Sequence, residues 1–245
     1  VTAAATQRIA NLEGRWVQYA EAAAHPKEAQ SAVKLVVQLG RLPIQQAAVA
    51  QLLSAAISQP FFDDLRTKQQ LGYVVRAGLS VLQEVYHLAF IVQGTAKPPP
   101  EMAASVHAFV HNAASLVANL TAAQFTQFVA STNKSLLDPP LELRSKAEGL
   151  WTRIAERSYD FDRARRVAAA LSNATQAQVE AMAKSLGTGG AGRLLVQVHG
   201  ADAPLPTAAD DGYTLVTGGV GAARGDKWFA PLDDPAKWRK HARGR

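Results

Sequence analysis

The sequence predicts an α+β fold, with helices packed on one face of a mostly antiparallel sheet. Two β-rich runs, 73–82 and 85–93, are joined by only two residues, as in an antiparallel hairpin. Several helical segments then follow in a row before a strand-like run at 194–198. This order differs from the regular alternation of strands and helices that is typical of a doubly wound parallel sheet.

The first predicted strand covers 33–39, where apolar and polar residues alternate. Gly40 and Pro43 end this strand. The following run, 44–66, has the apolar spacing of a helix. Pro60 lies inside that run and predicts a kink or a break into two helices, because proline removes a backbone donor.

Start signals mark the later helices. A Lys-Pro-Pro-Pro run at 97–100 precedes a helix whose apolar residues recur every three or four positions over 102–120. Thr-x-x-Gln capping boxes predict helices that begin after Thr121 and Thr175. A further amphipathic helix is expected over 143–154.

The composition is that of a globular domain. Of the 245 residues, 48% are apolar and 19% are charged. No apolar run reaches the roughly 18–20 residues that cross a bilayer, so no membrane partner is expected. The absence of cysteine excludes disulfides and thiolate zinc sites and fits a reducing compartment, so a cytoplasmic location is expected. The chain begins with Val1 rather than Met and carries no signal-peptide pattern, which predicts a fragment of a longer protein.

The net charge of +6 is concentrated near the C-terminus, because residues 224–245 contain seven Lys or Arg and three Asp. We expect an N-terminal lead-in over 1–30, one domain over 31–200 and a loosely ordered basic tail over 201–245. A nucleic-acid surface would need basic residues on one folded face with aromatic residues among them. No nucleic-acid partner is therefore expected, and the competing nucleic-acid hypothesis predicts salt-sensitive binding.

The most specific motif is Phe-Phe-Asp-Asp-Leu-Arg-Thr-Lys-Gln-Gln-Leu-Gly-Tyr at 61–73. Taken alone, it predicts the end of a helix, a turn at Gly72 and the start of a strand. Arg66 and Lys68 suit the negative end of a helix dipole. Gly72 allows a backbone conformation or a close approach that other residues resist.

This motif resembles the Leu-Arg-Thr-Lys-x-Gln-Leu-Gly-Tyr signature in the C-terminal half of the insulin-degrading enzyme (insulysin/pitrilysin) family of zinc metallopeptidases. The similarity covers roughly 30–200 and includes weaker matches along the rest of that range. These matches are the helix entry at 97–99, the segments 137–140 and 159–163, and the strand at 194–199.

The resemblance implies the fourth domain of a four-domain enzyme, with a metallopeptidase/processing-peptidase-like fold, whose two halves enclose a peptide chamber. The zinc would lie on a His-x-x-Glu-His motif in a missing N-terminal domain, so no metal or cofactor is expected in this chain. Arg66 matches an arginine that binds a substrate carbonyl. Tyr73 matches a catalytic tyrosine whose hydroxyl contacts substrate and helps to stabilise the oxyanion.

The expected function is that of a non-catalytic substrate-binding domain of a zinc metalloendopeptidase that degrades peptides. Its expected partners are peptide substrates and the N-terminal half of the same enzyme, and homodimerisation of the parent is left open. The alternative is a stand-alone inactive homologue that acts as a scaffold or regulatory partner. Whether the chain belongs to an active enzyme stays open at this point, because it lacks the His-x-x-Glu-His motif.

His107 and His111 lie four residues apart on one predicted helix face, which is a metal-ligand spacing. A zinc protease also needs a glutamate to activate water, and Val110 occupies the position it would take. We therefore predict surface or groove-lining histidines rather than a metal site.

Overall fold

The computed structural model describes residues 12, 14–155, 158–188 and 190–218. Within these ranges, no helix combines the length and the apolar character that crossing a membrane requires.

A six-stranded sheet forms one layer of the molecule, in the order β3-β4-β2-β5-β1-β6. β3 and β4, β4 and β2, and β2 and β5 form antiparallel pairs. β1 runs parallel to both of its neighbours, β5 and β6. The sheet is thus mixed but mostly antiparallel, which confirms the predicted fold class. The strands are β1 (Trp16–Ala22), β2 (Ser31–Arg41), β3 (Val74–Leu82), β4 (Val85–Gly94), β5 (Gly192–His199) and β6 (Thr214–Gly218).

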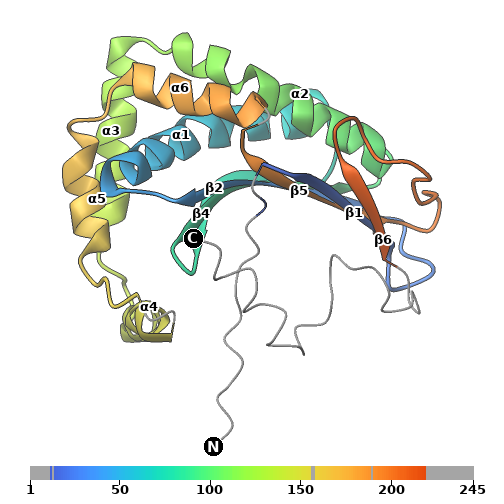
Figure 1. Cartoon of the computed structure of the whole chain (residues 1–245), viewed down its shortest axis with the longest axis horizontal. Helices are drawn as coiled ribbons and strands as arrows, with labels where there is room; N and C mark the ends of the chain where they lie inside the picture. Colours follow the sequence, from blue (N-terminus) through green and yellow to red (C-terminus); the bar gives the residue numbers. More distant parts are fainter. Residues whose placement is uncertain (1–11, 13, 156–157, 189, 219–245) are drawn as a thin grey trace, which may run out of the picture.

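The helices form a second layer on one face of the sheet (Figure 1). α1 and α2 pack directly on the strands, α6 packs on both of these helices, α5 packs on α1, and α3 packs on α1 and α5. α4 stands apart from this layer (Figure 1). The helical elements are α1 (Ile44–Phe62), the π-helix η1 (Asp63–Lys68), α2 (Pro99–Ala118), α3 (Ala122–Leu137), α4 (Leu143–Ala155), α5 (Arg163–Leu171) and α6 (Gln176–Gly187).

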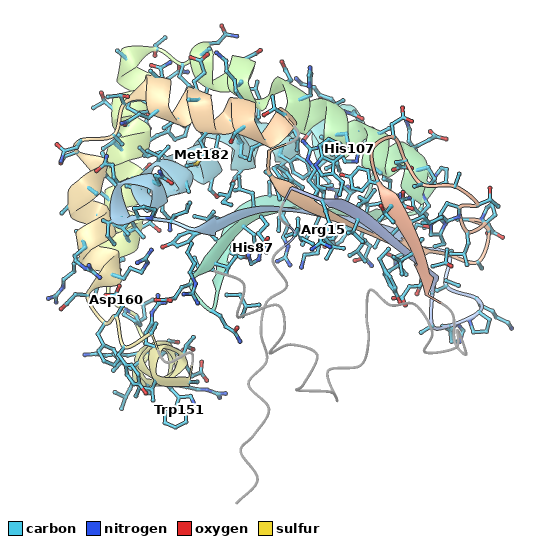
Figure 2. The ribbon with its side chains drawn as sticks, viewed as in Figure 1. Arg15, His87, His107, Trp151, Asp160 and Met182 are labelled. Carbon is cyan, nitrogen blue, oxygen red and sulfur yellow. The ribbon has the colours of Figure 1, made fainter. Side chains whose placement is uncertain are left out.

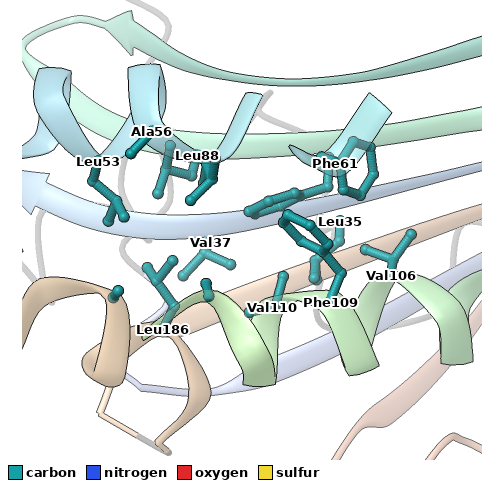
Figure 3. Packing of buried hydrophobic residues seen from close by; sticks show 14 of the residues in the cluster. Leu35, Val37, Leu53, Ala56, Phe61, Leu88, Val106, Phe109, Val110 and Leu186 are labelled. Carbon is teal, nitrogen blue, oxygen red and sulfur yellow. The ribbon is translucent and has the colours of Figure 1, made fainter. Parts of the chain in front are cut away.

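The hydrophobic core lies between the sheet and the helices (Figure 3). Phe61, near the end of α1, is fully buried at its centre. Its ring centroid lies 5.4 Å from that of Phe90 on β4 and 5.0 Å from that of Phe109 on α2, both in edge-on geometry. This arrangement is favourable for aromatic rings, so one residue joins α1, the sheet and α2.

Local sequence signals placed several elements correctly. The hairpin turns at Gln83 and Glu84, which have φ angles of 48° and 66°. Two positive φ angles in a two-residue loop match the twist of the flanking strands. Both capping boxes are present, with Thr121 and Thr175 each accepting a hydrogen bond from the backbone of the glutamine three residues later.

Of the kink or break predicted at Pro60, the break does not occur. α1 continues to Phe62 and passes directly into the π-helix η1, where the N–H of Gln69 donates to the carbonyl of Asp64. The irregularity therefore falls after the proline rather than at it. π-helical turns of this kind are uncommon and are frequent at functional sites.

Three elements were not predicted: α5, β1 and β6. β1 lies within the range expected as a lead-in and β6 within the range expected as a tail, yet both belong to the central sheet. Polar residues on the buried face obscured the strand pattern. The side chain of Gln18 on β1 is fully buried and donates to Oε1 of Gln197 on β5 at 3.0 Å.

No described strand pairs with the outer edge of β3, and α1 covers part of this edge. The backbone N–H of Leu79 donates to Oγ of Ser54 at 2.9 Å. Oγ of Ser58 donates to the carbonyl of Ala77 at 3.0 Å. Two serines on α1 thus satisfy backbone groups that an edge strand would otherwise expose.

Beneath α2, a cationic side chain of β5 is buried beside two aromatic rings. Arg193 is only 4% exposed, lies 3.8 Å above the ring of Trp16 and donates to the carbonyl of Leu186 at the end of α6. Within the described ranges it forms no ion pair. A cation over an aromatic face and at a helix C-terminus is stabilised in both positions.

His107 lies in the same region (Figure 2). Its ring centroid is 5.5 Å from that of Tyr213, and its Nε2 is buried without a hydrogen-bond partner among the described residues. Burial lowers the pKa of His107 from 6.5 to about 4, and the charge of Arg193 acts in the same direction. His107 is therefore half-buried beside Tyr213, whereas His111 on the same helix is exposed.

His107 should make the fold sensitive to mild acid. Because its folded pKa is depressed from 6.5 to about 4, the unfolded chain binds a proton in that window that the folded chain does not. The free energy of unfolding should thus fall as pH drops through the window, by about 3 kcal/mol near its lower end. Urea unfolding at neutral pH and near the lower end should show this loss in the native chain and in His111→Gln, and a smaller loss in His107→Gln. Equal losses in all three proteins would refute the assignment to His107.

Candidate functional site

The candidate site is built on the segment that joins α1 to β3. Leu65 and Leu71 are both fully buried in the core and hold the two ends of a short loop. The N–H of Leu71 donates to the carbonyl of Leu65 at 3.0 Å. Between them, Gln70 takes a φ of 52°, which turns the chain sharply. Two apolar anchors and one backbone bond therefore fix the polar residues of this segment.

Gly72 sets how closely the segment approaches the sheet. A Cβ atom at this position would lie 2.0 Å from the carbonyl oxygen of Gln93 near the end of β4, so a side chain does not fit without movement. The glycine is required here for close approach rather than for an unusual φ. Its own carbonyl accepts a hydrogen bond from Nη1 of Arg66 at 2.9 Å.

Arg66 and Tyr73, the two site residues predicted from the sequence, lie side by side. Cζ of Arg66 is 5.3 Å from the centroid of the Tyr73 ring, which is within cation–π range. Arg66 is half-buried, whereas Tyr73 is 81% exposed. The Tyr73 hydroxyl has no hydrogen-bond partner in the part of the chain that the structure describes. The fold thus presents a guanidinium and a phenol together at the surface.

The acidic residues beside the pair accept hydrogen bonds from glutamine side chains rather than from Arg66. Asp63 accepts from Nε2 of Gln59 at 2.8 Å, and Asp64 accepts from Nε2 of Gln69 at 3.2 Å. Among the described residues, no carboxylate forms an ion pair with Arg66. The guanidinium therefore keeps donor capacity for an external acceptor.

Phe62 is a neighbouring residue that the sequence analysis did not single out. It is 39% exposed and lies four residues before Arg66, at the end of α1. The doubled phenylalanine of the motif was the available signal, because Phe61 fills the core and the adjacent position on a helix points elsewhere. Phe62 thus offers an exposed apolar side chain about one helical turn before Arg66.

The two histidines with metal-ligand spacing do not form part of this site. His107 faces Tyr213, and His111 is exposed on the same helix. Across residues 12, 14–155, 158–188 and 190–218, no three His, Cys, Asp or Glu side chains gather closely enough to hold a metal ion. These residues therefore do not fit a zinc centre.

Comparisons with known proteins bear on the same segment. Residues 52–151 match the family model described as PQQ synthase PqqF-like, C-terminal lobe domain 4. This range contains Arg66, Gly72 and Tyr73. The matched part therefore includes the whole candidate site.

Curated relatives share the sequence at moderate identity. A nardilysin-like protein of Arabidopsis thaliana is 30% identical over 138 residues, which is 55% of this chain and 14% of that protein. Human insulin-degrading enzyme is 33% identical over 113 residues, which is 46% of this chain and 11% of that protein. The chain thus spans about a seventh or less of the length of these relatives.

Solved structures share the fold. Pitrilysin superposes with a TM-score of 0.71 at 20% identity, covering 83% of this chain and 22% of that chain. A peptidase M16 inactive domain from Pseudomonas fluorescens superposes with a TM-score of 0.53 at 15% identity, covering 80% of this chain and 44% of that chain. The matches to the C-terminal lobe model and to insulin-degrading enzyme confirm the resemblance carried by residues 61–73, and the solved structures share the fold.

Proposed function

We propose that the chain is a non-catalytic substrate-binding domain of a zinc metalloendopeptidase that degrades peptides. The Arg66–Tyr73 pair carries this proposal. Its members are predicted site residues, lie 5.3 Å apart from guanidinium carbon to ring centroid, and stand at the surface with donor groups available. The similarity to insulin-degrading enzyme and to an M16 inactive domain supports the division of labour.

The chemistry of peptide hydrolysis suits these two side chains. Negative charge develops on the former carbonyl oxygen, and one fixed donor to such an oxygen is worth about 3–4 kcal/mol in comparable sites. In this proposal, Arg66 binds a substrate carbonyl with a permanently charged, planar fork that lysine cannot reproduce. The Tyr73 hydroxyl donates to the oxygen that becomes negative. The zinc, its ligands and the general base belong to an N-terminal domain of the parent enzyme.

Preorganisation is what the scaffold adds. Arg66 is tied through Nη1 to the carbonyl of Gly72, and its guanidinium lies against the Tyr73 ring. Arg66 lies within the loop whose ends Leu65 and Leu71 fix in the core, and Tyr73 follows shortly after it. Donors that are held in place before substrate arrives cost little reorganisation during the reaction.

A second candidate function is that of an inactive homologue acting as a scaffold or regulatory partner. The similarity to a domain described as an inactive M16 domain favours it. The two hypotheses differ in what Arg66 and Tyr73 do. A scaffold would keep its partner interactions when these side chains are changed, whereas a substrate-binding domain would lose turnover in the parent enzyme.

The isolated 245-residue chain should bind no stoichiometric zinc and should not cleave peptides. The physical reason is that its described side chains bring no three metal ligands together. Metal analysis of the purified chain and a fluorogenic peptide assay test this directly. One tightly held zinc per chain, or cleavage by the chain alone, would contradict the proposed division of labour.

Tyr73→Phe in the complete enzyme should reduce kcat by roughly 100-fold, the usual effect of removing an oxyanion donor. The melting temperature should stay unchanged, because the Tyr73 side chain is 81% exposed. Ser80→Ala, which removes an exposed hydroxyl from β3, the strand that follows Tyr73, is the matched control. Steady-state kinetics with both variants decide the matter, and native turnover in Tyr73→Phe would remove this residue from the mechanism.

Gly72→Ala should destabilise the chain by about 1–3 kcal/mol, since the new methyl group overlaps the backbone of β4. It should also displace the carbonyl that holds Arg66. Gly78→Ala on β3 is the control, because a Cβ there meets no heavy atom within 4 Å. Denaturant unfolding of both variants measures the difference, and equal stability would show that close approach at Gly72 is not required.

A further inference from the structure

α4 (Leu143–Ala155) is a helix without a folded partner. None of its residues is buried, and it makes no substantial packing contact with another helix or strand of the described chain. Figure 1 shows it apart from the helical layer, and Figure 2 shows Trp151 on its side away from that layer. The side chain of Trp151 is 67% exposed and that of Leu143 is 84% exposed.

The exposed apolar residues of α4 form a single stripe. Leu143, Ala147, Leu150 and Ile154 follow one another at spacings of four, three and four residues, which places them on one helix face, and Trp151 flanks them. We call these five residues the α4 stripe. Such spacing is typical of a helix that packs against a hydrophobic surface.

The exposed large hydrophobic residues are concentrated around α4 rather than spread over the described part of the molecule. Of the twelve large hydrophobic residues that are exposed in the described ranges, eight fall between positions 137 and 161. Exposed apolar side chains that gather in this way usually mark an interaction surface. The eight are Leu137, Leu141, Leu143, Leu150, Trp151, Ile154, Tyr159 and Phe161.

α4 is also too short to be stable by itself. Isolated helices below about 12–15 residues are marginal in water, and Gly149 lowers the helix propensity further. Packing of the apolar face supplies most of the stability of such helices in proteins. A surface outside the described residues is therefore needed to hold α4 in its helical form.

The chain that leaves α4 is firmly attached to the body. Arg163 donates from Nε to the hydroxyl of Tyr86 at 2.8 Å and from Nη2 to the carbonyl of Leu42 at 2.9 Å. Asp160 approaches Nη1 of the same arginine to 3.5 Å. α4 is consequently displayed from a fixed base rather than from a loose terminus.

We propose that the α4 stripe packs into an apolar groove, bordered by acidic residues, on a neighbouring domain of the same polypeptide. This inference rests on the proposed function, which places the chain inside a longer enzyme. Two observations favour a neighbouring domain as the partner of the α4 stripe. The matched relatives extend far beyond the shared region, since the chain covers 22% of the pitrilysin chain and 14% of the nardilysin-like protein. α4 carries three basic residues, Arg144, Lys146 and Arg153, and one acidic residue, Glu148, which pairs with Arg144 at 2.8 Å. The helix therefore has a net positive charge, which suits an acidic border.

Amide hydrogen exchange of α4 tests the proposal without relying on peptidase activity. In the 245-residue chain, the α4 amides should exchange with little protection, and acrylamide should quench Trp151 readily. In the longer protein expressed from its natural gene, exchange should be slower by roughly tenfold or more. Equal exchange in both proteins would overturn the proposal, as would a natural gene that encodes nothing beyond these residues.

Matched variants separate packing from general effects. Leu150→Asp should leave the melting temperature of the 245-residue chain unchanged and should abolish the added protection of α4 in the longer protein. Ser145→Asp, which places the same charge on the polar side of α4, should leave that protection intact. Protection that survives Leu150→Asp would refute the role of the stripe.

Two further outcomes would point to a different partner for the α4 stripe or to a failure of the enzyme hypothesis. Concentration-dependent association of the 245-residue chain, seen by sedimentation and lost in Leu150→Asp, would assign the stripe to a second copy and overturn the proposal. Failure of the enzyme hypothesis would appear separately, as native turnover in Tyr73→Phe with α4 protection unchanged.

Discussion

The close contact between Gly72 and the backbone near Gln93 is the constraint on which the candidate site depends. It lets the chain leave the π-helix, turn and enter β3 while Leu65 and Leu71 stay buried on either side. The carbonyl that results from this path is the one to which Arg66 donates. Core packing and site geometry are therefore set by the same few residues, and a change to the loop disturbs both.

Local signals were sufficient where short-range geometry decides the structure. The two-residue hairpin at Gln83 and Glu84 and the capping boxes at Thr121 and Thr175 follow from neighbouring residues alone. The Arg66–Tyr73 pair was found through the family resemblance. The family resemblance did not reveal the hydrogen bond from Arg66 to Gly72 or the π-helix that carries Arg66. Both arise from packing between α1 and the end of β4.

Long-range burial accounts for what the sequence did not reveal. Gln18 on β1 pairs with Gln197 inside the protein, so β1 carries a polar residue on its buried face and lacks the apolar alternation by which strands are recognised. The sequence predicts a surface or groove-lining position for His107, but it does not reveal the contact with the ring of Tyr213, which lies far along the chain. Polar residues that become buried only through tertiary contacts carry no local signature.

The serines that cover β3 have a consequence for peptide recognition. Ser54 and Ser58 occupy the backbone N–H of Leu79 and the carbonyl of Ala77, so an incoming peptide cannot form a continuous ladder of main-chain bonds along the middle of this edge. A ligand held beside Tyr73 would therefore depend on side-chain contacts there rather than on extended main-chain pairing with β3.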